Sequence, residues 1–150
     1  MVTAAETSEP AGVKYTVSPI GWVRQDQGGH PRIVLEKKYQ PGLLGLEGFS
    51  HVFVFWWFDR NDTAAKRQIL QVHPRGNPAN PLTGVFATRA PVRPNLIALT
   101  LCRIISIREN VIEVESIDAM PDTPVLDLKP YTGEGERAGA FRVPDWARPK

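Results

Sequence analysis

The sequence predicts an all-β fold of short antiparallel strands, arranged as a sandwich or a barrel. Fourteen prolines and twelve glycines in 150 residues interrupt the chain too often for long helices. No segment keeps the 3.6-residue apolar periodicity of an amphipathic helix. Short runs of β-branched and aromatic residues instead alternate with clusters of turn residues, which is typical of a single all-β domain.

Seven strands are expected, at residues 15–24, 32–38, 51–58, 67–72, 97–107, 111–117 and 125–128. The clearest antiparallel pair lies between residues 104 and 117, where Arg108, Glu109 and Asn110 form a tight turn. Residues 73–83 contain three prolines and are expected to form a long loop. The polar segment 132–150 either packs through Phe141 and Trp146 or stays mobile.

The expected strand at residues 51–58, HVFVFWWF, is apolar at every position after its histidine. A strand without a polar face is expected to be buried on both sides. A closed barrel, a partner subunit or a covering loop would each bury the second face, and a homodimer is the commonest partner arrangement.

Composition narrows the class of protein. Lys and Arg exceed Asp and Glu between residues 13 and 110, and the excess reverses between 111 and 150, so one face could meet a polyanion. We expect a cytoplasmic protein, because the first residues do not resemble a signal peptide and no apolar run could span a membrane. The single cysteine, Cys102, cannot form an internal disulfide and is expected to be a small buried apolar side chain.

Familiar catalytic motifs are missing. The three histidines, His30, His51 and His73, lack the spacing of metal ligands, so no metal is expected. There is no nucleophile elbow and no G-x-G-x-x-G turn, so a nucleotide-like cofactor would bind on β-loops at a non-Rossmann site.

One candidate binding cluster is GVFATRAPVRPNLIALT at residues 84–100. It places Arg89 and Arg93 on a loop stiffened by prolines, and a rigid base lowers the entropy lost when a guanidinium binds a carboxylate or phosphate. Taken alone, the segment fits two solvated loop arginines better than a binding site.

Two further clusters carry carboxylates and a histidine. Residues 117–131, IDAMPDTPVLDLKPY, contain Asp118 and Asp122, which could bond a ribose diol or lie near a sulfonium, or simply build an Asx-type turn. Residues 45–51, GLEGFSH, bring Ser50 and His51 to the start of the aromatic strand, where a histidine is more often structural.

Taken in order, these clusters resemble the signature of the TrmO-type (TsaA/YaeB-like) tRNA methyltransferase family. The family pattern runs roughly G-L-E-x-F-S-H, G-V-F-A-T-R-S-P-x-R-P-N-P-I-G-L-S and D-x-x-D-G-T-P-V-L-D-I-K-P-Y. The matching stretches here are GLEGFSH (45–51), GVFATRAPVRPNLIALT (84–100) and DAMPDTPVLDLKPY (118–131), and PIGWVR (19–24) is similar to the family's first strand. The resemblance covers residues 15–131.

The resemblance implies a single compact antiparallel β-barrel domain with long loops at residues 13–131, between a flexible N-terminal tail (1–12) and a C-terminal tail (132–150). It also implies S-adenosyl-L-methionine as cofactor, and a homodimer with sites near the subunit interface. The activity implied is methylation of N6 of threonylcarbamoyl-adenosine beside the anticodon of tRNA. The general base is not identified, and Tyr131, Asp118 and His51 are candidates by residue type only.

Matched positions assign roles to thirteen residues. Those implied for cofactor binding are Ser50, His51, Phe86, Arg89, Leu101, Asp118, Asp122, Thr123 and Pro124. Those implied to lie near the cofactor or the incoming tRNA are Arg93, Asn95, Lys129 and Tyr131.

The sequence departs from the family pattern at two places. Leu96-Ile97-Ala98 replaces Pro-Ile-Gly, and Pro121-Asp122-Thr123 replaces Asp-Gly-Thr. If the lost glycine needs a positive φ, the turn must be rebuilt. Two alternatives therefore stay open: a cofactor-binding module without tRNA methylation, and a methyltransferase with a small-molecule acceptor.

Overall fold

Short strands make up most of the regular structure in the computed structural model, which describes residues 12–149. The strands are β1 (Gly21–Arg24), β2 (Arg32–Leu35), β3 (His51–Trp57), β4 (Gln71–Val72), β5 (Thr83–Gly84), β6 (Ile97–Arg108), β7 (Val111–Val114) and β8 (Pro124–Pro130). The helical elements are α1 (Ala64–Arg67) and the 3₁₀ turns η1 (Lys37–Leu43), η2 (Leu46–Gly48), η3 (Asp59–Asn61), η4 (Pro74–Gly76), η5 (Val85–Ala87) and η6 (Asp145–Ala147). No helix among the described residues has the length and apolarity needed to cross a bilayer.

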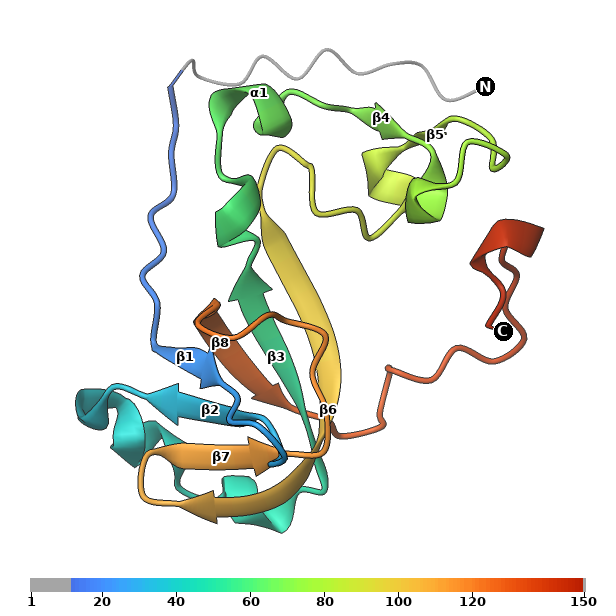
Figure 1. Cartoon of the computed structure of the whole chain (residues 1–150). Coiled ribbons are helices and arrows are strands. Elements are labelled where there is room, and N and C mark those ends of the chain that lie inside the picture. Colours follow the sequence, from blue (N-terminus) through green and yellow to red (C-terminus); the bar gives the residue numbers. More distant parts are fainter. Residues whose placement is uncertain (1–11, 150) are drawn as a thin grey trace.

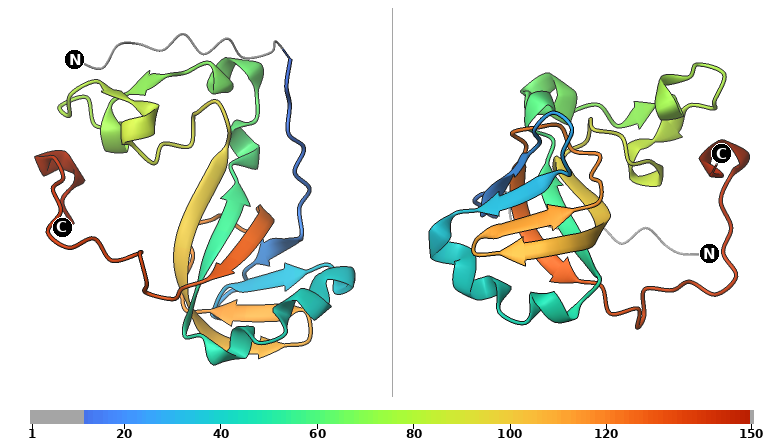
Figure 2. Two further views of the ribbon diagram at one scale, coloured as in Figure 1. Left: turned by 180° about the vertical axis from the view of Figure 1, so that it is seen from behind. Right: turned by 60° about the horizontal axis from the view of Figure 1, so that its bottom comes forward.

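Six strands pair antiparallel in the order β1-β2-β7-β6-β3-β8 (Figure 1). The order closes on itself because β8 also pairs with β1, where Gly21 lies opposite Val125. The closed sheet is seen from a second direction in the right-hand view of Figure 2. β4 and β5 form a separate two-stranded sheet. Together with the loops around them, they lie beyond the end of the closed sheet where β3 ends and β6 begins. The predicted all-β antiparallel architecture is confirmed.

Alternating side chains of the strands fill the interior of the closed sheet. In β3 the side chains of Val52, Val54 and Trp56 are buried, and those of the residues between them are half-buried. The buried apolar residues packed together with them are Val23, Ile33, Leu35, Leu43, Ala98, Cys102, Ile112, Val114, Ala119 and Val125. Burial on both faces of β3 was expected, but within one chain only one face is fully covered.

Irregular pairing bends the two longest ladders. The register between β3 and β8 shifts between Phe55 and Trp56, and the register between β6 and β7 shifts between Ile104 and Ser106. Extra residues of this kind bend a strand and increase its twist. A small closed sheet needs such bends because its strands must turn around a narrow interior.

The hairpin predicted at Arg108–Asn110 is confirmed, because Arg108 pairs with Val111 and leaves a two-residue turn. Glu109 takes a positive φ of 53° in that turn. The buried side chain of Asn110 donates through Nδ2 to the carbonyl oxygen of Leu35 at 2.6 Å, so the turn is tied to β2.

Several expected strands are shorter than predicted, for local reasons. Residues 15–20 make no ladder, and Tyr15 is exposed. The strand expected at 67–72 is replaced at its start by α1, because Thr63 caps the good helix formers Ala64–Arg67 by accepting the N–H of Lys66 at 3.2 Å. Strand β5 was not expected.

The structure describes most of the C-terminal tail but little of the N-terminal one. The expected N-terminal tail lies outside the described residues except for Gly12. The C-terminal segment extends away from the closed sheet in Figure 1, and the side chain of Phe141 in it is 75% exposed. Arg75 Nη2 donates to the carbonyl oxygen of Arg148 at 3.2 Å, so this segment contacts the loop after β4. Phe141 therefore does not anchor the tail on its own chain.

Replacing Gly21 by alanine should destabilise the fold by about 2–3 kcal/mol. A Cβ at Gly21 would overlap the carbonyl oxygen of Val34 and lie 2.7 Å from the Cα of Leu35, both rigid parts of β2. Gly42→Ala is the matched control, because no atom lies within 4 Å of a Cβ there. Urea unfolding of both variants measures the difference, and equal midpoints would contradict this account of the β1–β2 approach.

The thiol of Cys102 should be inert in the native protein at pH 8. Burial raises the pKa of this thiol to about 12, with the nearby charge of Asp118 contributing, and the side chain is 1% exposed. The reactive thiolate is therefore scarce and shielded. A chromogenic thiol titration should detect no reaction before denaturation and one equivalent after it; a full equivalent from the native protein would disprove the burial.

Candidate functional site

A cavity of about 210 Å³ lies where β3 ends and β6 begins. It is lined by Trp56, Phe58, Thr88, Arg89, Arg93, Ile97, Ala98, Leu99 and Asp118. The ring centroids of Trp56 and Phe58 are 4.7 Å apart in an edge-to-face arrangement. The cavity thus combines aromatic side chains with two arginines and one carboxylate, and it brings together three of the residues predicted from the sequence.

A chain of hydrogen bonds fixes the carboxylate. Trp56 Nε1 donates to Thr100 Oγ1 at 3.0 Å, and the Thr100 hydroxyl donates to Asp118 Oδ1. Trp56 and Thr100 belong to the adjacent strands β3 and β6, whereas Asp118 lies in the loop between β7 and β8. The Asp118 side chain is therefore linked to the most regular part of the sheet.

The loop that carries the arginines is held by its own polar groups. Arg93 Nη1 donates to the carbonyl oxygens of Thr88 and Ala90 at 3.2 and 3.1 Å. Thr88 Oγ1 donates to the Val85 carbonyl at 3.0 Å and accepts from the Ala90 N–H at 3.2 Å. Arg93 thus stabilises the loop by hydrogen bonds to its backbone, whereas Arg89 is exposed and lines the cavity.

A second network attaches this loop to the segment after β3. Arg67 donates through Nε to Asp62 at 2.8 Å and through Nη1 to the Pro94 carbonyl at 3.1 Å. Trp57 Nε1 donates to the other oxygen of Asp62 at 3.1 Å. The hydrogen bond from Arg67, assisted by the one from Trp57, holds the pKa of Asp62 below its ordinary value. The contacts with Arg67 and Trp57 thus favour the charged form of this carboxylate.

The predicted residues Ser50 and His51 lie at the opposite end of β3. Their side chains share a hydrogen bond of 2.7 Å between Ser50 Oγ and His51 Nδ1. The ring of Tyr131 lies 6.1 Å from that of His51 and 5.8 Å from that of Phe53. Six residue steps along a strand span roughly 20 Å. One chain therefore does not bring this pair to the cavity that contains Arg89.

Leu101 and Lys129 lie on the outer face of the sheet near that second group. Both are paired with Phe53, Leu101 from β6 and Lys129 from β8. Lys129 Nζ is 3.1 Å from Asp127 Oδ2 and 5.9 Å from the centre of the Phe55 ring. Phe86, predicted as a cofactor contact, is 80% exposed and does not line the cavity; Asn95 is also exposed.

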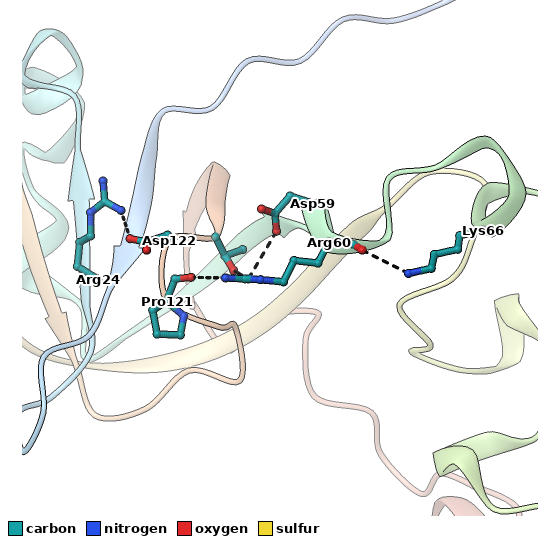
Figure 3. A network of polar contacts seen from close by, with 7 residues as sticks. Arg24, Asp59, Arg60, Lys66, Pro121 and Asp122 are labelled. Atoms are coloured by element: carbon teal, nitrogen blue, oxygen red, sulfur yellow. Dashed lines mark hydrogen bonds and ion pairs between the residues drawn. The ribbon is translucent and has the colours of Figure 1, made fainter.

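The third predicted group is the turn before β8. Asp122 forms an ion pair with Arg24, and Arg60 donates to the Pro121 carbonyl and to the Thr123 hydroxyl (Figure 3). Thr123 is buried, and Pro124 begins β8. None of the residues from Asp122 to Pro124 lines the cavity.

A larger cavity of about 400 Å³ lies under η1 and η2, lined mainly by apolar side chains such as Leu35, Leu43 and Leu128. It contains none of the predicted site residues. Within residues 12–149 no group of His, Cys, Asp and Glu side chains is arranged to hold a metal ion.

Sequence reasoning missed several contributors. Trp56 and Phe58 were treated as buried strand residues, and nothing in the sequence singles out Thr100 or Arg60. Their partners lie 18 or more positions away, so only the folded chain brings them together. The departures at Leu96 and Ala98 are absorbed by packing, because both side chains are buried and Ala98 also lines the cavity.

The arrangement in the cavity suits a ligand with an anionic group, a polar diol or cationic centre, and a flat ring. Arg89 can pair with a carboxylate or phosphate, and Asp118 can accept hydrogen bonds or face a positive charge. Trp56 and Phe58 offer aromatic surface. None of these groups is a nucleophile activated by a neighbouring base, so the cavity is built to bind and orient.

Comparisons with known proteins agree on one family. The family model of the tRNA-methyltransferase O N-terminal domain matches residues 22–136. The chain is 42% identical over 118 residues to a "Probable S-adenosyl-L-methionine-binding protein" of Methanocaldococcus jannaschii, covering 79% of this chain and 93% of that protein. It is 45% identical over 92 residues to the human tRNA (adenine(37)-N6)-methyltransferase, covering 61% of this chain but 20% of that enzyme.

Solved structures show the same likeness in three dimensions. A crystal structure of TrmO from Pseudomonas aeruginosa superposes with a TM-score of 0.71 at 25% identity, over 91% of this chain and 63% of that one. This chain thus spans under two-thirds of that bacterial enzyme. The matched model, the relatives and the shared fold lead to one conclusion: the chain belongs to the tRNA-methyltransferase O N-terminal domain family.

Proposed function

We propose that the protein is an S-adenosyl-L-methionine-dependent methyltransferase that modifies tRNA in the cytoplasm. The observation that carries the proposal is the cavity in which Arg89, Asp118 and the Trp56–Phe58 pair converge. Its chemistry matches the parts of the cofactor: a carboxylate, a sulfonium with a ribose diol beside it, and a flat adenine. The names of the M. jannaschii and human relatives support the same cofactor and reaction class.

In this proposal the closed sheet is a β-barrel that binds the cofactor on its loops, without a Rossmann turn. Arg89 would pair with the cofactor's carboxylate, and Asp118, held by Thr100, would bond the ribose or face the sulfonium. The loop bearing Arg89 is already rigid, so little entropy would be lost on binding.

The cofactor supplies a methyl group already activated by its positive sulfur. The protein's main tasks are then alignment and exclusion of water. Asp118 and the aromatic pair would fix the methyl donor, and the acceptor nitrogen would approach in line and give up its proton. Asp118, His51 and Tyr131 remain the candidates to receive that proton, directly or through water.

We further propose a homodimer whose two copies complete each other's sites. The cavity of about 210 Å³ in one chain is smaller than the roughly 300–1,000 Å³ typical of pockets that enclose a ligand of this size. The outer face of β3 and β6 is apolar: Phe53, Phe55 and Trp57 pair with Leu101, Leu99 and Ile97. The three β6 side chains are each at least 40% exposed.

A two-fold axis lying between two such faces, perpendicular to β3, would pack the β3 strands of the two copies against each other in opposite directions. The Ser50–His51 pair of one copy would then lie beside the Arg89 end of its partner. This arrangement accounts for predicted site residues at both ends of β3, which one chain keeps apart. It also covers the second face of the aromatic strand.

For the acceptor we propose N6 of threonylcarbamoyl-adenosine beside the tRNA anticodon, as the family resemblance implies. The human relative is named for methylation of adenine 37 of tRNA. Lys129, Tyr131, Arg93 and Asn95 are the proposed residues near the cofactor or RNA. Lys129 is exposed near the His51 group, and Asn95 is exposed on the loop beside the cavity.

Arg89→Ala should slow methyl transfer to tRNA about 10- to 100-fold at sub-saturating S-adenosyl-L-methionine while leaving the fold intact. Arg89 forms none of the hydrogen bonds or ion pairs found among the described residues, so its loss should weaken cofactor binding by about 10- to 100-fold through the missing charged pair. The measurement is transfer of a radiolabelled methyl group from S-adenosyl-L-methionine to total tRNA, compared with tRNA lacking threonylcarbamoyl-adenosine. Arg108→Ala, on the exposed hairpin, is the control; equal labelling of both tRNA pools would refute the proposed acceptor.

Mixing two impaired variants, assayed at low S-adenosyl-L-methionine, should restore activity if sites form between copies. His51→Ala and Arg89→Ala dimers, unfolded together and refolded at equal amounts, should recover about a quarter of wild-type activity, because half the dimers are mixed and each has one intact site. Adding Phe53→Asp to both variants should remove the recovery by charging the apolar face. No recovery without Phe53→Asp, despite mixed dimers seen by native mass spectrometry, would place each site within one chain.

A further inference from the structure

The turn that follows Asp118 contains an unusual backbone conformation. Asp122 has a φ of 66°, in the left-handed region that favours glycine. Its N–H donates to the Val23 carbonyl at 2.8 Å, and the Thr123 N–H donates to the Met120 carbonyl at 3.3 Å. An L-residue in this region costs roughly 1–2 kcal/mol, less for aspartate than for most residues. Some other interaction must therefore favour aspartate here.

The Arg24 side chain supplies that interaction. Arg24 is the last residue of β1, and Nη1 forms an ion pair with Asp122 Oδ1 across 98 positions of sequence. Its guanidinium also lies 5.9 Å from the centre of the Trp22 ring, which limits its freedom. The Asp122 carboxylate therefore faces β1 and is not directed into the cavity.

Arg60 holds the turn from the other side. It lies in η3, directly after β3, and Nη2 donates to the Pro121 carbonyl at 2.7 Å while Nη1 donates to Thr123 Oγ1 at 3.3 Å. Asp59 lies 3.8 Å from the same guanidinium, and Lys66 Nζ donates to the Arg60 carbonyl at 3.4 Å. Figure 3 shows the two arginines on opposite sides of the turn.

The held turn connects two fixed points. Upstream, Asp118 lines the cavity and Ala119 is buried; downstream, Thr123 is buried and Pro124 begins β8. Residues 120–122 between them are exposed and lie outside any strand. Between these ends the segment is held by the two arginines and by the backbone hydrogen bond from the Asp122 N–H to the Val23 carbonyl.

We propose that Arg24 and Arg60 are positioning residues that clamp the 120–123 turn, so that Asp118 is presented to the cavity. In this role the Arg24–Asp122 ion pair offsets the backbone strain that arises because residue 122 is aspartate, where the family pattern has glycine. The clamp rests on the proposed cofactor site for its functional meaning, but its structural part is independent of which ligand binds. Asp122 then acts through Arg24 and does not contact the cofactor.

The decisive test uses glycine at the left-handed position. Asp122→Gly adopts this φ freely, so cofactor affinity, measured by calorimetry with S-adenosyl-L-methionine, should stay within about twofold of wild type. Asp122→Ala loses the ion pair with Arg24 and lacks the conformational freedom of glycine, so it should bind S-adenosyl-L-methionine about tenfold more weakly. Arg24→Ala should weaken binding severalfold in the wild type but have no effect in Asp122→Gly.

Arg60 is tested by a conservative pair. Arg60→Ala should raise the KM for S-adenosyl-L-methionine about tenfold while leaving kcat at saturation within twofold, because it removes two hydrogen bonds that position a binding group. Arg60→Lys keeps one donor to the Pro121 carbonyl and should recover part of the loss. Arg108→Ala, at the exposed hairpin, should leave KM unchanged.

Hydrogen exchange separates failure of the clamp from failure of the proposed function. The amides of Asp122 and Thr123 should exchange faster in Arg24→Ala and Arg60→Ala, with or without any cofactor. If wild-type protein bound no cofactor, this measurement would still decide the clamp. Two results would overturn the proposed clamp. One is equal cofactor affinity in Asp122→Ala and Asp122→Gly; the other is a loss of affinity from Arg24→Ala that is as large in Asp122→Gly as in the wild type.

Discussion

The antiparallel ladder between β3 and β6 is the interaction on which the rest of the structure depends. Seven residues of β3 pair in unbroken register with β6, from His51 opposite Arg103 to Trp57 opposite Ile97. One face of the ladder supplies Val52, Val54 and Trp56 to the core, and the other supplies the apolar surface. The cavity lies at one end and the Ser50–His51 pair at the other, so a shift in this register would displace every proposed element of the site.

Much of this could be predicted from the sequence, because the strands that matter most have strong local signals. HVFVFWWF indicates a strand with at least one buried face, and the hairpin at Glu109 and Asn110 is short and flanked by apolar runs. Residues 15–20 and 67–70 contain β-branched and apolar residues that suggest strands, but neither segment forms a strand in the structure. Propensity indicates what a segment can do, whereas pairing depends on the whole sheet.

The candidate site was predicted only in part. Arg89, Arg93 and Asp118 converge on one cavity, as the motif order suggested, but their supports could not be found from the sequence. Thr100 orients Asp118, and Arg67 ties Pro94 to the segment after β3. Both hydrogen bonds join residues that are far apart in sequence, and nothing in the sequence singles out Thr100 or Arg67. At the departures from the family pattern, Leu96 and Ala98 are buried in the core and Asp122 has a positive φ.

The left-handed Asp122 also bears on how such a sequence can arise. Two of the four glycine codons become aspartate codons by one base change at the second position, so the replacement can occur in a single mutation. In a chain without arginine at position 24, replacing glycine by aspartate at position 122 would add backbone strain and an unpaired carboxylate to the loop that carries Asp118. Made after Arg24 is present, the same mutation gains an ion partner at once. If the proposed clamp holds, the order of the two substitutions matters: arginine at position 24 before aspartate at position 122 avoids the strained intermediate.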